Sequence, residues 1–256
     1  MTQPLASLNT TISRPVTDLR NWSDRIRAYL LAETWWTAVQ GMSYVAPSSG
    51  RRRIRPRVGV QELRPGVGTQ AWFDEGAYKV PRWTGLAEEA QYLAPVARPE
   101  NGRLSVIVGG RARADRSPYA ALLTNGVTAL TLFHAWQGNP AFYGADRTIV
   151  RFTNNQTALG SRFVYGLTFD WATRNAACAV NGGAFTTLTS VLTGAMPAAP
   201  LEMLVGGSSP TPRWGAEITR FNGELHEAMA LPGVDLREQP DFWGAINSYA
   251  TEIWGA

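Results

Sequence analysis

The segment FVYGLTFDWATRNAACAVNGG, residues 163–183, decides how this chain folds. Its first half, Phe163 to Trp171, is rich in aromatic and β-branched residues, which favour a strand. A polar stretch follows, and then a second apolar run from Ala177 to Asn181. Asn and Gly tolerate the positive φ that a tight hairpin turn requires. The segment therefore predicts two antiparallel strands followed by a turn at Asn181-Gly182.

Similar short strands are expected along the chain from about residue 70 onward. Runs of β-branched and aromatic residues recur at intervals of roughly ten residues, and glycine, asparagine and proline turn signals separate them. The clearest of these runs are Leu104–Val108, Ala129–Trp136, Arg147–Thr153 and Leu201–Val205. This spacing predicts an antiparallel β-sandwich.

Two sequence clusters resemble one particular sandwich. The first is residues 163–183, and the second is LEMLVG at 201–206 followed by FNGELHEAMAL at 221–231. In their order and spacing they resemble the concanavalin A-like, laminin-G-like jelly roll, a mainly β fold of two antiparallel sheets. In such a fold Gly223 lets two backbones approach closely, and residues 242–250 correspond to a short terminal helix. The resemblance covers about residues 75–256.

The N-terminal part of the chain has a different pattern. Between Thr17 and Trp36, apolar residues recur at three- and four-residue steps, which predicts an amphipathic helix. The residues of this stripe that we assign to partner binding are Trp22, Ile26 and Leu30. The stripe packs either on its own domain or on copies of itself in an oligomer. We therefore divide the chain into residues 1–70, a helix and basic arm for attachment or oligomerisation, and residues 71–256, the jelly-roll domain.

Residues 47–68 have the composition of a connector, with PSSG at its start. A basic run follows, and its arginines are the other partner-binding candidates: Arg51, Arg52, Arg53, Arg55 and Arg57. Such a run either stays solvated, contacts a neighbouring subunit or binds an acidic partner. We favour a linker or a subunit contact over DNA binding, because no helix with interleaved aromatic and basic residues accompanies the run.

Composition excludes several classes of protein. With 256 residues, 45% of them hydrophobic, the chain can bury a large β-sheet core. A formal charge of +4 is mild and does not require nucleic acid as a partner. The single cysteine, Cys178, excludes an intrachain disulfide, and its apolar neighbours predict a buried thiol. Residues 1–9 lack the features of a signal peptide, and no segment is long and apolar enough to span a membrane.

The sequence offers no recognised catalytic pattern. Retaining glycoside hydrolases of this fold place two carboxylates about 5 Å apart on one face of a strand. Glu88 and Glu89 are adjacent and Glu224 and Glu227 are three apart, so regular alternation puts each pair on opposite faces. The histidine-zinc and nucleophilic-serine motifs are missing as well. We therefore expect a binding protein and not an enzyme, with a polysaccharide depolymerase that uses distant carboxylates as the third-ranked alternative.

Sugar recognition requires an aromatic ring that stacks on a pyranose, beside polar groups that hydrogen-bond its hydroxyls. Residues of these types near expected loop ends are the carbohydrate-binding candidates: Trp136, Asn139, Tyr143, Asn154, Asn155, Trp171 and Trp214. Each has a plain structural alternative, such as a turn at Asn154-Asn155 or a core edge at Trp171. Asp170 and Asp146 are the candidate ligands for calcium, the one cofactor that related lectins suggest.

A jelly roll behind an N-terminal helix and arm resembles virion proteins of tailed bacteriophages and phage-like particles, where such domains occur in fibres, spikes and head decorations. The resemblance implies an adhesin or decoration protein at the virion surface, synthesised in the host cytoplasm. Its partners would be other virion proteins through residues 1–70, a cell-surface polysaccharide through the sandwich, and copies of itself, with a trimer favoured. A structural assembly role without sugar binding is the main alternative.

Overall fold

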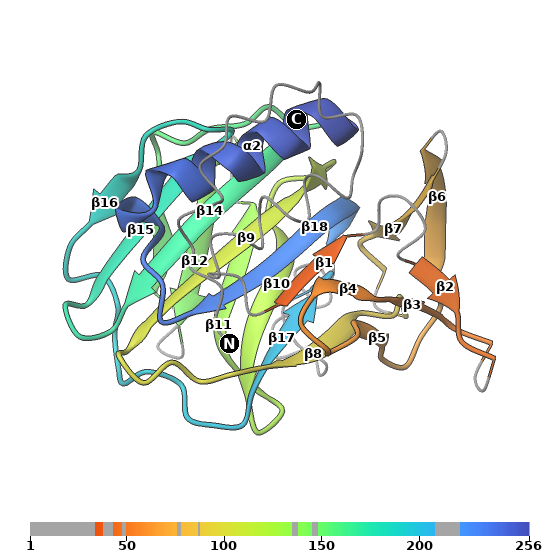
Figure 1. The fold of residues 1–256 in the computed structure, drawn as a ribbon, viewed down its shortest axis with the longest axis horizontal. Helices are drawn as coiled ribbons and strands as arrows, with labels where there is room; N and C mark the ends of the chain where they lie inside the picture. Colours follow the sequence, from red (N-terminus) through yellow and green to blue (C-terminus); the bar gives the residue numbers. More distant parts are fainter. Residues whose placement is uncertain are drawn as a thin grey trace, which may run out of the picture.

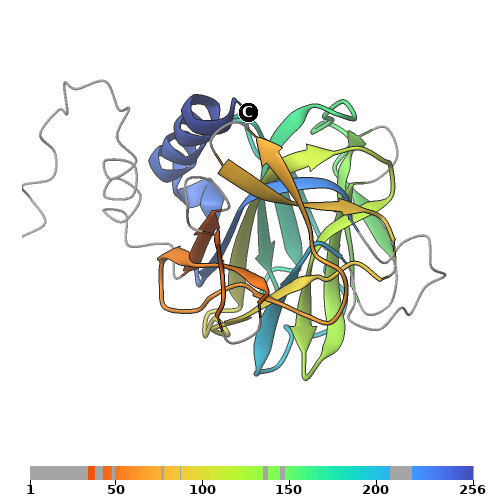
Figure 2. The same cartoon turned by 90° about the vertical axis from the view of Figure 1, so that its right-hand side faces the viewer.

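The computed structural model describes residues 34–37, 43–47, 50–75, 78–86, 88–134, 138–144, 148–207 and 221–255. In these ranges the chain forms two antiparallel sheets packed face to face, with a C-terminal helix on the outside (Figures 1 and 2). The predicted mainly β, two-sheet sandwich is therefore confirmed. No helix among these residues is both long and apolar enough to cross a membrane.

The larger sheet has nine strands in the described part of the chain. Their order is β16, β15, β14, β9, β18, β1, β4, while β7 pairs with β18 and β6 pairs with β7. The strands are β1 (Thr34–Thr37), β4 (Pro56–Val58), β6 (Ala71–Glu75), β7 (Tyr78–Thr84), β9 (Arg103–Ala112), β14 (Arg162–Asp170), β15 (Asn175–Val180), β16 (Thr186–Leu188) and β18 (Asn222–Pro232).

The smaller sheet has seven strands in the order β13, β12, β11, β10, β17, β8, β5. These are β5 (Arg64–Pro65), β8 (Tyr92–Val96), β10 (Ser117–Thr124), β11 (Val127–His134), β12 (Pro140–Gly144), β13 (Ile149–Arg151) and β17 (Leu201–Val205). A separate two-stranded sheet joins β2 (Ser43–Val45) to β3 (Arg52–Ile54).

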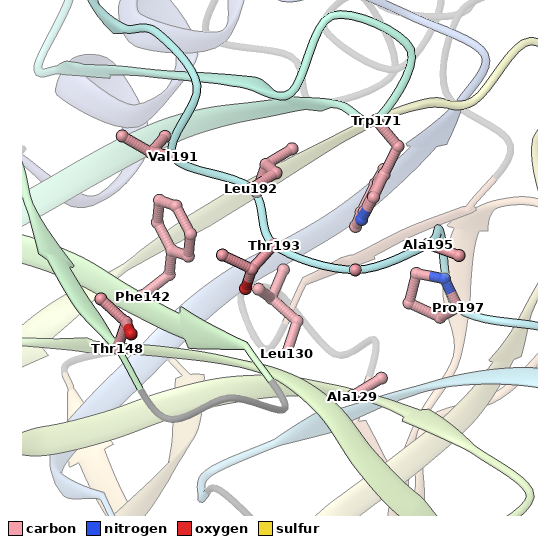
Figure 3. Close-up of a pocket in the computed structure, with 11 residues that line it drawn as sticks. Ala129, Leu130, Phe142, Thr148, Trp171, Val191, Leu192, Thr193, Ala195 and Pro197 are labelled. Atoms are coloured by element: carbon pink, nitrogen blue, oxygen red, sulfur yellow. The ribbon is translucent and has the colours of Figure 1, made fainter.

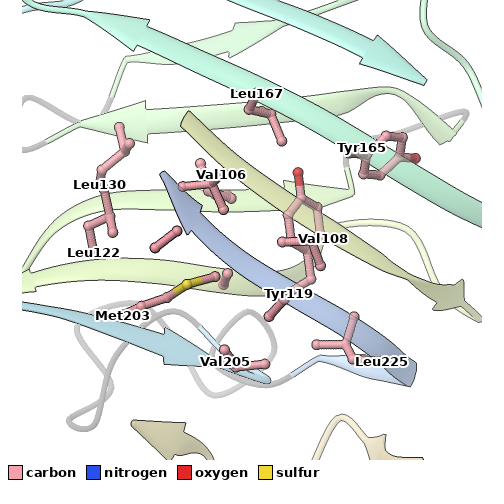
Figure 4. Packing of buried hydrophobic residues seen from close by; sticks show 14 of the residues in the cluster. Val106, Val108, Tyr119, Leu122, Leu130, Tyr165, Leu167, Met203, Val205 and Leu225 are labelled. Carbon is pink, nitrogen blue, oxygen red and sulfur yellow. The ribbon is translucent and has the colours of Figure 1, made fainter. Parts of the chain in front are cut away.

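The main hydrophobic core fills the space between the two sheets (Figure 4). Strand β14 shows how alternation builds it: Tyr165, Leu167 and Phe169 point into this core, whereas Val164 points to the outer face. Cys178 on β15 is fully buried in the same core, and burial raises the pKa of its thiol. The predicted role of the cysteine as a small buried hydrophobe is confirmed.

The hairpin turn predicted at Asn181-Gly182 is also confirmed. Strands β14 and β15 pair antiparallel, with Tyr165 opposite Val180. Asn181 and Gly182 then adopt φ values of 47° and 78°, and the N–H of Gly183 donates to the carbonyl of Val180 at 2.8 Å. These are the two positive-φ positions that a primed hairpin turn requires.

Helix α2 (Pro240–Trp254), preceded by the 3₁₀ turn η4 (Leu236–Glu238), covers the outer face of the larger sheet (Figure 1). Trp243 of this helix lies directly over Gly166 of β14. A Cβ atom at residue 166 would come within 2.8 Å of the Trp243 ring, so glycine makes room for the indole. The expected short terminal helix is therefore present and packs tightly.

The predicted N-terminal helix is wrong at its C-terminal end; its earlier part, with Trp22, Ile26 and Leu30, lies outside the described residues. Trp35 and Trp36 lie in β1, which pairs with β18 and places Trp35 opposite Met229. Trp36 packs in the core between the sheets, while Trp35 packs under α2. The tryptophan pair favours a strand here, because successive side chains of a strand point to opposite faces of the sheet. One ring can therefore enter the core between the sheets and the other the core under α2.

The expected connector at residues 47–68 is wrong in its described part, because β3, β4 and β5 form there. Since β1, β4 and β5 belong to the two sheets, the predicted boundary at residue 70 does not follow the sandwich. The arginines make contacts within the chain. Arg51 donates to the carbonyls of Gly66 and Gly68, Arg53 pairs with Glu62 at 3.2 Å, and the guanidinium carbons of Arg52 and Arg57 lie 5.2 Å and 6.0 Å from the ring centroids of Trp72 and Trp35.

Candidate functional site

A pocket of about 160 Å³ opens at the edge of the sandwich, where the turn after β14 faces β11 and β12 of the other sheet (Figure 3). One of the predicted sugar-binding residues, Trp171, lines it. The residues that line the pocket are Ala129, Leu130, Phe142, Thr148, Trp171, Val191, Leu192, Thr193, Gly194, Ala195 and Pro197.

The pocket has an apolar floor and a partly polar rim. Leu130, Phe142 and Leu192 are buried and belong to the core between the sheets. Trp171 is half-buried, and Thr148 and Thr193 are exposed. Figure 3 shows the Trp171 ring on one side of the pocket, with Phe142 and Thr148 on the other. The arrangement combines the aromatic ring of Trp171 with threonine side chains in one pocket lining.

Hydrogen bonds at the end of β14 fix the position of Trp171. The N–H of Trp171 donates to the carbonyl of Gly102 at 3.0 Å. The preceding carboxylate, that of Asp170, accepts from the N–H groups of Ala172 and Thr173 at 3.0 Å and 3.1 Å and pairs with Arg103 at 3.2 Å. The turn that carries the ring is therefore held by one buried carboxylate, which satisfies backbone donors as a cap does.

Another wall of the pocket, formed by residues 191–197, is hydrogen-bonded to the turn that carries Trp171. The N–H groups of Val191 and Leu192 donate to the carbonyl of Arg174 at 2.9 Å and 3.0 Å. Farther along, the guanidinium of Arg98 donates to the carbonyl of Pro197 at 3.1 Å. Residues 191–197 have no regular secondary structure and no distinctive motif, so their place in the wall of this pocket could not be predicted from the sequence.

The size of the pocket limits what it can hold. Its volume is about 160 Å³. This is below the several hundred cubic ångströms that a drug-sized ligand needs. The pocket therefore suits a single sugar ring or a similar group that stacks on Trp171.

The other predicted sugar-binding residues do not reach this pocket. Asn139 and Asn155 are buried near the start of β12, at the end of that strand away from Thr148, and Asn154 is exposed beside them. Tyr143 packs against Phe133, with ring centroids 5.4 Å apart. Trp136 and Trp214 lie outside the described residues.

Of the two predicted calcium ligands, only Asp170 lies among the described residues. Both oxygens of Asp170 are engaged by Arg103 and by backbone N–H groups. Asp146 falls outside the described residues. Among the residues that the structure describes, no three His, Cys, Asp or Glu side chains are grouped as metal ligands would be.

The expectation that Glu224 and Glu227 lie on opposite faces of a strand is wrong. The pairing of β18 with β9 shifts between Leu225 and Glu227, so His226 is an extra residue in a β-bulge. Leu225 and Ala228 consequently both face the core between the sheets. Glu224 and Glu227 therefore share the outer face, although each is engaged by its own partners.

Glu227 is buried between β1, β18 and α2. Its Oε1 accepts from the hydroxyls of Thr37 and Tyr249 at 2.6 Å and 2.7 Å, and its Oε2 accepts from Trp35 Nε1 at 2.6 Å. Burial raises the pKa of this carboxyl to about 7, although the three donors and the charge of Arg57 act in the opposite direction. A carboxyl enclosed in this way contacts no ligand and joins three elements of the fold.

Comparison with known proteins identifies the class of fold. No protein-family model and no curated sequence matches this chain. Several solved structures match this chain in fold, at 14% identity or less, which agrees with the β-sandwich that the sequence clusters indicated.

Three of these structures show the extent of the match. Domain 4 of the GH43 extracellular arabinanase from Geobacillus stearothermophilus, in complex with arabinotriose, gives a TM-score of 0.52 at 14% identity and covers 82% of this chain and 98% of that one. Trypanosoma rangeli sialidase in complex with sialic acid gives 0.55 at 12% identity and covers 87% of this chain, although only 33% of the sialidase. Botulinum neurotoxin type C, described as entering cells by interaction with two ganglioside molecules, gives 0.53 at 9% identity, with 90% and 53% covered.

Proposed function

We propose that this protein is a lectin-like binding protein and that its Trp171 pocket holds one residue of a glycan. The observation that carries the proposal is the half-buried Trp171 residue, whose backbone Asp170 and Gly102 hold at the mouth of a pocket that Thr193, an exposed residue, also lines. An aromatic face that is fixed in advance binds a sugar without an ordering cost, and hydroxyls at the rim supply hydrogen bonds.

The fold supports this proposal through two of its structural neighbours. The arabinanase domain is described with arabinotriose bound, and the neurotoxin with gangliosides, so proteins that contain a sandwich of this shape carry glycan ligands. At these identities the likeness extends to the fold alone. The glycan specificity of this chain must therefore come from its own pocket.

Binding without hydrolysis is the second part of the proposal. Glu227 is enclosed under α2, and Glu224 forms ion pairs with two arginines, so neither carboxylate of this pair faces a ligand. A depolymerase would need a proton donor and a second carboxylate beside the substrate. The described lining of the Trp171 pocket contains no carboxylate.

We further propose that the protein serves on the surface of a virion or phage-like particle, as an adhesin or decoration protein. The arrangement of a jelly-roll domain behind an N-terminal segment supports this assignment, because it resembles the arrangement in such proteins. The proposed partners are other virion proteins, a cell-surface polysaccharide and copies of this chain, with a trimer favoured and with calcium as the proposed ion.

A glycan array with purified protein tests the binding proposal. We expect the wild type to bind at least one class of glycan and Trp171→Ala to bind it roughly tenfold more weakly, because the stacking surface is lost. Leu159→Ala is the matched control, since Leu159 is an exposed apolar side chain outside the pocket. Equal binding by all three proteins would overturn the assignment of the site. Release of reducing ends from the bound glycan would show that the protein is a depolymerase and not a lectin.

A further inference from the structure

A buried carboxylate holds two arginines at the opposite end of the larger sheet from Trp171. Glu224, whose side chain is 2% exposed, pairs with Arg82 Nε at 3.1 Å and with Arg113 Nε at 2.9 Å. The two arginines come from β7 and from the residue after β9, and they approach the carboxylate from both sides of β18. We call Glu224, Arg82 and Arg113 the Glu224 cluster.

The strand register adds more positive charge beside this cluster. Arg162 on β14 lies opposite Arg111 on β9, Arg111 lies opposite Glu224 on β18, and Glu224 lies opposite Arg82 on β7. The register therefore places two more arginines, Arg111 and Arg162, on the same face of the sheet as the Glu224 cluster.

One of these arginines already has a place in the fold. A Cβ atom at Gly255, just past α2, would lie 2.7 Å from Arg162 Nη1, so the guanidinium sits at the C-terminal end of that helix. The helix dipole favours a cation there. Figure 1 shows this end of α2 on the same side of the larger sheet as the beginning of β18.

Arg82 and Arg113 retain unused hydrogen-bond donors. Each contacts Glu224 through Nε, and among the described residues the terminal Nη groups of both have no hydrogen-bond partner. Their side chains are 32% and 37% exposed. The guanidinium carbon of Arg82 also lies 4.6 Å from the Phe73 ring centroid, which holds the group flat. Both guanidinium heads are therefore positioned by the fold and remain open to solvent.

We propose that the Glu224 cluster binds an oxyanion group, a carboxylate or a sulfate, of an acidic polysaccharide. A planar guanidinium matches such a group with two parallel hydrogen bonds, and two guanidinium heads on one carboxylate form a compact receptor. Arg162 and Asp170 are the two ends of β14, so at about 3.3 Å per residue this site lies on the order of 30 Å from Trp171 and does not depend on that pocket.

The compactness of the cluster favours a polysaccharide over nucleic acid. Duplex DNA is held by several phosphate contacts spread along a stripe, and base stacking needs an open aromatic face. Here two guanidinium heads occupy one spot, and Arg82 already covers a face of Phe73. A polymer with one charge per sugar residue fits a spot of this size better.

Fluorescence anisotropy with labelled dextran sulfate, polygalacturonate, neutral dextran and a DNA duplex tests the proposal on the full chain. We expect at least one acidic polysaccharide to bind, dextran not to bind, and Arg113→Gln to weaken binding roughly tenfold to a hundredfold, as loss of a charged hydrogen bond does. Arg113→Lys keeps a positive charge beside Glu224 but lacks the planar fork, so it should weaken binding as well and remain folded.

Arg64→Gln is the matched control, because Arg64 is an exposed arginine on β5 of the other sheet. We expect a change of less than twofold for Arg64→Gln and for Trp171→Ala. Equal losses in Arg64→Gln and Arg113→Gln would show a diffuse charge effect and overturn the site. Absence of binding to both acidic polymers, or tighter binding of the DNA duplex that depends on Arg113, would overturn the proposed ligand.

Discussion

The buried carboxyl of Glu227 should make the stability of this protein depend on pH in an unusual direction. Its pKa is raised to about 7 from an ordinary value of 4.5 because burial disfavours the charged form. Between pH 4.5 and about 7, Glu227 therefore keeps its proton in the folded protein but has released it in the unfolded chain. The contribution of Glu227 to the free energy of unfolding is complete below pH 4.5 and is lost as the pH rises through 7.

The size of the effect follows from the shift. A change from 4.5 to about 7 corresponds to about 3 kcal/mol, at about 1.4 kcal/mol for each pKa unit. Glu227→Gln keeps the shape of the side chain and is neutral at every pH. Its amide can accept from Trp35 and donate to the hydroxyl of Tyr249 or Thr37, since hydroxyls can turn to accept. The variant should therefore fold with the same contacts.

Urea denaturation followed by tryptophan fluorescence at pH 4.5 and pH 8 measures this difference. We expect the free energy of unfolding of Glu227→Gln, relative to the wild type, to rise by about 3 kcal/mol between the two pH values. Glu252→Gln, at an exposed position of α2, is the control and should show no such trend. A difference that stays constant with pH, or that falls, would refute the view that Glu227 is held as a neutral acid.

Two further predictions concern the packing of α2 and the turn that carries Trp171. Gly166→Val should lower the free energy of unfolding by about 1–3 kcal/mol in a denaturant titration, because the new side chain meets the Trp243 ring; Gly244→Ala, with open space around its Cα, should be neutral or stabilising. Asp170→Ala should cost about 1–3 kcal/mol, because two backbone N–H groups and Arg103 lose their acceptor, and it should also weaken glycan binding through Trp171. If calcium instead raises the melting temperature of the wild type and leaves that of Asp170→Ala unchanged, Asp170 is a metal ligand.

Much of the fold could be predicted from local signals in the sequence. The turn at Asn181-Gly182 could be predicted because its two positive-φ positions are adjacent in the chain and suit few other residue pairs. The close approach at Gly223 followed in the same way, since a Cβ there would lie 2.0 Å from the carbonyl oxygen of Arg111. The spacing of the short apolar runs then predicted the antiparallel sandwich.

Features that depend on distant contacts could not be predicted in this way. Trp35 and Trp36 fit a helical pattern as well as a strand, and the choice is made by β18, which is about two hundred residues away in sequence. The Trp171 pocket required Leu192 and Thr193, which lie in a segment without a motif. Trp171 itself could be predicted as a candidate, because it is an aromatic residue beside a carboxylate at the expected end of a strand.

The bulge at His226 links the two outer-face carboxylates to different functions. One extra residue turns both Glu224 and Glu227 to the outer face, and their neighbours then separate them. Glu227 meets uncharged donors under α2 and takes up a proton near neutral pH, so it does not offset the arginines of the same face. Glu224 meets Arg82 and Arg113 and aligns their guanidinium heads. A deletion of the bulged residue would restore regular alternation and would turn one of these carboxylates toward the apolar core between the sheets. The protein would then lose either the hydrogen bonds of Glu227 to β1 or the Glu224 cluster.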